Sequence, residues 1–90
     1  MDFEWDTEKE LVNIQKHQIS FEEAKKAFFD EKRLINIDIK HSTEEEKRYF
    51  CFGNTDKGII TVRFTIRNSK IRIIGAGLWR DGRKIYEQEN

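Results

Sequence analysis

The sequence predicts a single α+β domain spanning residues 1–90, with two N-terminal helices, a four-stranded antiparallel sheet and a short C-terminal helix. Three observations support this class. A chain of 90 residues is too short for two ordinary hydrophobic cores. Helix-capping signals fall in the first third of the chain, and from Arg33 onward the apolar residues recur with the period of a strand.

The first helix is expected over about residues 7–17. Asp6 is placed to cap its N-terminus, and Glu8 lies in the first turn, where a carboxylate interacts favourably with the helix dipole. The second helix is expected over about residues 21–30. It follows the capping box Ser20-Phe21-Glu22-Glu23 and gathers four side chains on one face: Phe21, Ala24, Ala27 and Phe28.

Four strands follow, at about 34–39, 48–53, 58–67 and 70–76, each rich in β-branched and aromatic residues. Hairpin turns are expected at 54–57 and 68–69. A helix near 81–89 ends the chain. This order places helices against a face of the sheet.

The composition excludes several classes of protein. Cys51 has no partner for a disulfide, and one cysteine with two separated histidines has no zinc-ligand spacing, so no metal or cofactor is expected. No apolar run approaches the roughly 20 residues that cross a bilayer, and the acidic N-terminus is unlike a signal peptide. The chain is therefore expected to be cytoplasmic, without a membrane partner.

The net charge of zero is the sum of two opposite halves. Residues 1–46 carry seven Lys or Arg against 13 Asp or Glu, whereas residues 47–90 carry ten against four. Such asymmetry indicates either an internal electrostatic match or a basic surface that binds a polyanion. Composition does not choose between them.

Strand alternation places the basic residues on one face of the sheet. In the third strand, Arg63 and Arg67 alternate with an apolar set, and Arg72 and Arg48 join the same polar side if the register permits. This face is either a phosphate-binding surface or an ordinary solvated sheet face balanced by acids from the first half.

The segment Gly75–Arg80 leaves the last strand. Trp79 followed by Arg80 offers a stacking plane beside a cation, or else forms a tight corner with Trp79 packed in the core. His17 and His41 are candidates for proton transfer near neutral pH, and Tyr86 is a possible phenolic donor. Alternatively, His17 interacts with the dipole at the end of its helix, and Tyr86 is a packing residue. Cys51 is expected to be a small apolar residue of the core.

Several short motifs together resemble the BrnT toxin family. They are Phe3-Glu4-Trp5-Asp6, Lys16-His17, Ser20-Phe21-Glu22-Glu23-Ala24, His41-Ser42 ahead of Glu46-Lys47-Arg48, Ile71-Arg72-Ile73-Ile74, and Ile85-Tyr86-Glu87. Each is weak alone, but their order covers nearly the whole chain. The resemblance implies a RelE-like fold and a metal-independent ribonuclease toxin of a type II toxin–antitoxin system.

The resemblance also implies partners and roles. The partners are an RNA substrate and a BrnA-type antitoxin with a ribbon-helix-helix region, and operator DNA is bound only through the antitoxin complex. From this chemistry and the matching positions we expect catalytic roles for Arg72, Arg80, His17, His41 and Tyr86. RNA-binding roles are expected for Arg48, Arg63, Arg67, Trp79, Arg83 and Lys84.

One stretch departs from the family pattern. Many relatives have Ser-Ala-Arg after the Arg-Ile-Ile stretch, where this chain has Gly75-Ala76-Gly77. A cation near position 77 is therefore missing. Two functions stay open: an active endoribonuclease, or a weak or inactive homologue kept for antitoxin binding and operon repression. Direct DNA binding is disfavoured, because no helix carries a basic groove-reading pattern.

Overall fold

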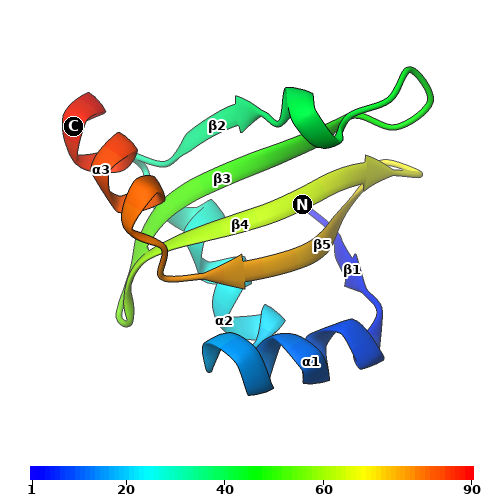
Figure 1. Cartoon of the computed structure of the whole chain (residues 1–90), viewed down its shortest axis with the longest axis horizontal. Coiled ribbons are helices and arrows are strands. Elements are labelled where there is room, and N and C mark those ends of the chain that lie inside the picture. The colour runs from blue at the N-terminus through cyan, green and yellow to red at the C-terminus, as the bar shows by residue number, and fades with distance from the viewer.

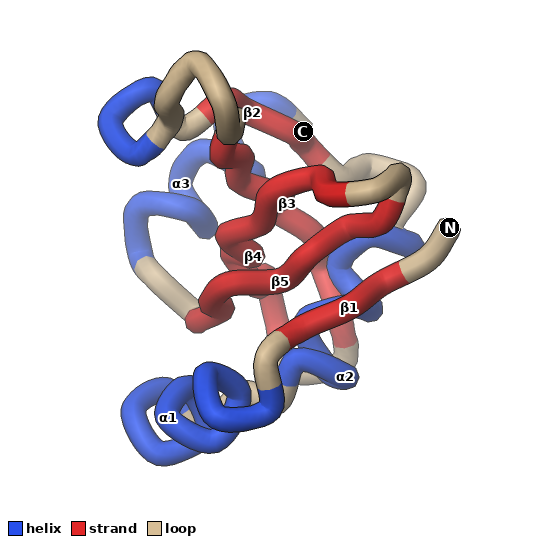
Figure 2. The backbone as a smooth tube through the Cα atoms, turned by 90° about the vertical axis from the view of Figure 1, so that its right-hand side faces the viewer, coloured by secondary structure: helices blue, strands red, loops and turns tan.

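A five-stranded mixed sheet organises the chain (Figure 1). The computed structural model describes all residues, 1–90. In chain order the elements are β1 (Phe3–Trp5), α1 (Thr7–His17), α2 (Phe21–Lys25), the 3-10 helix η1 (Lys26–Phe29), β2 (Leu34–Ile37), the 3-10 helix η2 (Ile39–His41), β3 (Arg48–Thr55), β4 (Gly58–Arg67), β5 (Lys70–Gly77) and α3 (Arg80–Glu89). The strand order is β1-β5-β4-β3-β2, so the first strand lies beside the last (Figure 2).

The prediction of four antiparallel strands was wrong in one respect. β2 to β5 are antiparallel neighbours as expected, but β1 adds a fifth strand that runs parallel to β5, with Phe3 opposite Ile71 and Trp5 opposite Ile73. Three residues are too short to display strand alternation. The pairing also joins segments almost 70 residues apart, which no local pattern reveals.

The capping signals were confirmed and the first helix has the predicted bounds, whereas the second helix and the strand β2 end earlier than predicted. The Asp6 carboxylate accepts from the backbone N–H groups of Glu8 and Lys9, and the capping box of Ser20 and Glu23 forms in full. The second helix is α-helical only to Lys25 and then tightens into η1. Similarly β2 stops at Ile37, because the Asp38 side chain caps η2 through the His41 N–H.

The hydrophobic core lies between the sheet and α2 with η1. Phe21, Ala24, Ala27 and Phe28 are all buried there, as their spacing predicted. They cover the sheet side chains that include Val62, Phe64, Ile73 and Cys51. Burial raises the pKa of the Cys51 thiol to about 12, so this cysteine is a packing residue as expected.

The opposite face of the sheet is only partly covered. α3 packs over one end of it, on the other side of the sheet from α2 (Figure 2). A Cβ built on Gly82 would lie 1.9 Å from Thr61 Oγ1 and 3.0 Å from the Phe52 ring, so only glycine allows this approach. None of the helices combines the length and apolarity needed to cross a membrane.

A β-bulge alters the side-chain pattern of β5. Arg63 pairs with Gly75 and Phe64 pairs with Ile73, which leaves Ile74 as an extra residue. Ile73 and Ala76 therefore face the core, whereas Ile74 and Gly75 both face the polar side. The bulge therefore places Ile74 and Gly75 next to Arg63 on the polar face, where all three line one cleft.

The Asn13 side chain fixes α1 along the edge of β5 beyond the end of β1. Its Nδ2 donates to the carbonyls of Ile19 and Ala76, both at 2.9 Å, and its Oδ1 accepts from the Ala76 N–H at 3.1 Å. Asn13 is 7% exposed. One amide thus satisfies the edge groups that a longer β1 would have paired.

Replacing Asn13 with alanine is expected to lower the free energy of unfolding by about 2–4 kcal/mol, because it leaves buried backbone groups of Ile19 and Ala76 without partners. Urea denaturation at neutral pH measures the loss. Gln15→Ala, an exposed position on the same helix, is the control and should change stability by less than about 0.5 kcal/mol. Equal effects of the two substitutions would contradict this role for Asn13.

Candidate functional site

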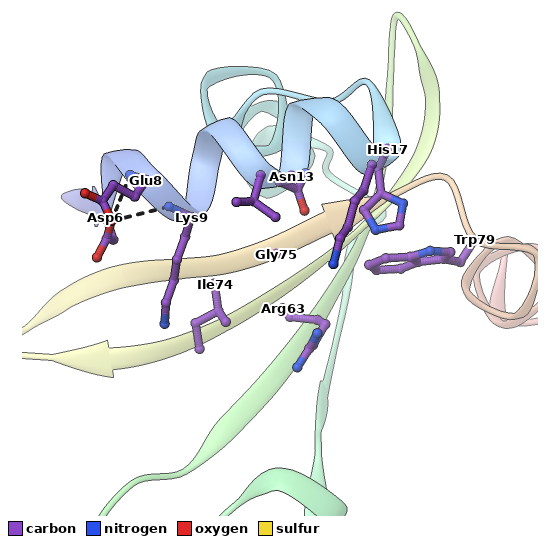
Figure 3. Close-up of a pocket in the computed structure, with 11 residues that line it drawn as sticks. Asp6, Glu8, Lys9, Asn13, His17, Arg63, Ile74, Gly75 and Trp79 are labelled. Carbon is purple, nitrogen blue, oxygen red and sulfur yellow. Dashed lines mark hydrogen bonds between the residues drawn. The ribbon is translucent and has the colours of Figure 1, made fainter.

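A cleft of about 440 Å³ runs between α1 and the polar face of the sheet (Figure 3). Asp6 and Glu8 lie at one end of it, and His17, Arg63 and Trp79 lie together at the other. The remaining lining residues include two lysines of α1, Lys9 and Lys16, and the bulge residues Ile74 and Gly75. The cleft therefore has one acidic end and one end that combines cations, an imidazole and an indole.

The helical period of α1 explains which side chains reach the cleft. Lys9, Asn13 and Lys16 are spaced by four and three residues and so share one face. Because Asn13 holds that face against β5, both lysines line the cleft. His17 is the last residue of the helix and reaches the cleft at its cationic end.

Trp79 forms the wall at this end. Its ring meets His17 edge-on, with centroids 5.1 Å apart and planes at 81°. A Cβ on Gly77 would lie 2.6 Å from Trp79 Cε2, so the indole lies directly on bare backbone. Trp79 is half-buried on the polar face rather than packed in the core, and it occupies the space beside position 77.

Intramolecular ion pairs neutralise most of the basic sheet face. The register does place Arg48, Thr65 and Arg72 in one cross-strand row. Arg72 Nη1 lies 3.3 Å from a carboxylate oxygen of Glu4 in β1. Arg48 and Arg67 both bind Glu46, at 3.2 and 2.7 Å, and hydrogen bonds from Arg67 and then Arg48 lower the Glu46 pKa.

Arg63 is the exception on this face. It forms no ion pair. It lies on the same side of the sheet as the paired arginines, but beyond their row, where its cross-strand partners are Phe50 and Gly75. The structure therefore answers the question that the charge asymmetry posed. The acidic half partly matches the basic half within the molecule, and the match leaves Arg63 free in the cleft.

A second cationic site lies on the other side of Trp79. Arg80 and Arg83 of α3 line a hollow of about 290 Å³ with Lys57, and neither arginine has an ion-pair partner. Lys57 is bound to Glu23 at 2.7 Å. Lys84 is exposed on the same helix but does not line this hollow. Trp79 thus separates two sets of unpaired cations.

The structure does not bring His41 and Tyr86 into the cleft. His41 follows β2, at the opposite edge of the sheet from α1, and its Nδ1 lies 2.8 Å from the Asp38 carboxylate. The Tyr86 hydroxyl donates to Asp30 Oδ2 at 2.5 Å, and this hydrogen bond, with burial, raises the tyrosine pKa to about 12. This contact anchors α3 to the loop before β2.

Apart from His17, sequence patterns missed the contribution of α1 to the site. Lys9 and Asn13 were not singled out, and Lys16 was noted only within a motif. Their spacing predicts that they share one face of the helix, but no pattern within the helix indicates that this face contacts the sheet. No group of three or more His, Cys, Asp or Glu side chains is arranged to hold a metal ion.

The Tyr86→Phe substitution is expected to lower stability by about 1.5–3 kcal/mol at neutral pH, since it removes a hydrogen bond to a carboxylate. The tyrosine pKa is raised from 10.0 to about 12, so its contribution is complete below pH 10 and is lost as the pH rises toward 12. Urea denaturation at pH 8 and pH 11.5 should therefore show a smaller difference between wild type and variant at the higher pH. A difference that stays constant would contradict the assignment.

Comparison with known families identifies one match. Residues 5–82 match the family described as "Ribonuclease toxin, BrnT, of type II toxin-antitoxin system". No curated protein matches the chain. The matched range includes α1, the whole sheet from β2 to β5, and Trp79. The chain therefore belongs to the BrnT family of ribonuclease toxins of type II toxin–antitoxin systems.

Proposed function

We propose that this protein is an endoribonuclease that cleaves RNA in the cleft between α1 and the sheet. The observation that carries the proposal is the meeting of His17, Arg63 and Trp79 at one end of that cleft. Phosphodiester cleavage needs a proton-transfer group and a cation for the developing charge. These three side chains supply an imidazole, a free guanidinium and a surface on which a base can stack.

The proposed reaction is attack of a ribose 2′-hydroxyl on the adjacent phosphate. His17 accepts the hydroxyl proton, O2′ bonds to phosphorus, and the P–O5′ bond breaks. The 5′-oxygen leaves with a proton from water, giving a 2′,3′-cyclic phosphate and a 5′-hydroxyl. Arg63 stabilises the charge on the phosphoryl oxygens, and Lys16 adds positive potential. Water supplies the proton for the leaving group, protein side chains supply the other roles, and no metal is invoked.

The other predicted residues receive supporting roles. Arg80 and Arg83 bind phosphates on the far side of Trp79, and Lys84 adds to the positive potential of α3. Arg48, Arg67 and Arg72 form ion pairs with carboxylates. We therefore propose that they stabilise the polar face of the sheet in the protein without bound RNA. The positions of His41 and Tyr86 favour structural roles.

Membership of a type II family implies an antitoxin partner. We propose that this partner is a BrnA-type protein with a ribbon-helix-helix region and that operator DNA is bound only through the complex. Arg80 and Arg83 are unpaired cations near Trp79, but the helix that bears them lacks the residue pattern of a helix that reads a DNA groove.

An inactive homologue that serves as antitoxin-binding module and co-repressor is the second candidate. It is favoured by one observation, the Trp79 ring against Gly77, because a cation cannot occupy position 77 without moving that ring. Induced expression separates the two candidates. Growth arrest with loss of RNA supports the nuclease, whereas normal growth with abundant folded protein supports the second candidate.

Removing the proposed catalytic groups should slow cleavage strongly without unfolding the protein. Arg63→Ala is expected to slow cleavage of a single-stranded RNA by about 10²- to 10³-fold, and His17→Ala by about 10²- to 10⁴-fold. The rates are measured by gel electrophoresis with purified full-length protein, with and without EDTA, and EDTA should have no effect.

The matched control is Lys40→Ala, an exposed cation on η2 outside the cleft, which should cleave at the wild-type rate. Circular dichroism checks that each variant is folded. If folded Arg63→Ala and His17→Ala both cleave as the wild type does, the site is wrong.

A further inference from the structure

An apolar groove of about 400 Å³ lies beside the cleft, between α3 and the strands β2 and β3. Its floor is formed by Phe50 and Phe52 of β3, and Ile85 of α3 forms one side. Trp79 lines both the groove and the cleft. We call this feature the α3 groove.

The register of the sheet places the α3 groove next to Arg63. Phe50 is the cross-strand partner of Arg63, so the two side chains are neighbours on the same face of the sheet. A nucleotide with its phosphate at Arg63 therefore has its base within reach of the Phe50 ring. The groove continues the cleft rather than forming a separate surface.

The groove has the chemistry of a base-binding slot. The Phe50 and Phe52 rings are stacked at 5.8 Å with an interplanar angle of 25°, and Phe50 is only half-buried. Two exposed polar side chains, Asn36 and Asp81, lie at its rim. Unstacked RNA bases bind by stacking on aromatic rings and by hydrogen bonds along their edges.

The charges around the groove favour a base over the phosphate chain. The Asp81 carboxylate repels phosphate but accepts a hydrogen bond from an exocyclic amino group. Unpaired cations lie on both sides of Trp79, at Arg63 and at Arg80. Phosphates thus have sites beside the groove, and the apolar floor remains for a base.

We propose that the α3 groove binds one nucleobase of the RNA substrate, with preference for a base that bears an exocyclic amino group. This proposal rests on the proposed nuclease function and adds a determinant of its substrate specificity. The occupant is the base that adjoins the phosphate at Arg63.

The test is binding of fluorescein-labelled 2′-O-methyl tetranucleotides, which cannot be cleaved, to the full-length protein. Fluorescence anisotropy should show tighter binding of the A and C tetramers than of the U tetramer. Phe50→Ala should weaken binding of the A and C tetramers by roughly tenfold or more, and Phe50→Tyr, which keeps the ring, should restore it. Asp81→Asn should reduce the preference over the U tetramer.

Phe29→Ala is the matched control, because Phe29 is an exposed phenylalanine of η1 on the opposite side of the sheet. Its tetramer affinities should equal those of the wild type. If Phe50→Ala binds all tetramers like wild type while Arg63→Ala weakens them, the groove is not a base site, but the phosphate site stands. If that same Phe50→Ala protein instead loses affinity for the purified antitoxin, the groove is a protein-docking site and this inference is overturned. If wild type binds no tetramer, both this inference and the proposed function fail.

Discussion

The hydrogen bonds of one buried amide determine where the site lies. Asn13 joins the middle of α1 to the free edge of β5 and to the backbone of Ile19, so it sets the distance between helix and sheet. The cleft is the space that this attachment leaves on the polar face. Its lysines and its histidine come from α1 and its arginine from β4, and the amide holds α1 beside the sheet by replacing the missing part of β1 as the partner of Ala76.

The distribution of ion pairs gives the second constraint. The same acids that make the first half of the chain negative are used to hold Arg48, Arg67, Arg72 and Lys57. Three arginines of the basic half have no ion pair, Arg63, Arg80 and Arg83, and all three lie in the hollows that Trp79 lines. The sheet face looks uniformly basic in the sequence, but in the structure Arg63 is its one arginine without an ion pair. Arg63 lines the cleft with His17 and Trp79, and Phe50 is its cross-strand neighbour.

Local signals predicted the parts of the fold that local physics determines. The caps at Asp6 and Ser20, the buried face of α2 and η1, and the alternation in β4 depend on neighbours within a few residues. The parallel pairing of β1, the bulge at Ile74 and the attachment of Asn13 depend on contacts across most of the chain. His17, Arg63 and Trp79 were each recognised as chemically capable, but their meeting is a product of those distant contacts. His41 and Tyr86 have suitable chemistry too, but each is bound to a carboxylate outside the cleft, His41 to the nearby Asp38 and Tyr86 to the distant Asp30.

The parallel contact between the two ends of the chain also bears on biosynthesis. β1 has no partner until β5 has been made, and the cleft combines Lys9 of the first helix with Trp79, which follows the last strand. Residues up to Trp79 must therefore have left the ribosome before the site exists. Sheets built from such distant contacts also form more slowly than helical bundles. The proposed activity is therefore expected only after β5 and Trp79 have joined α1.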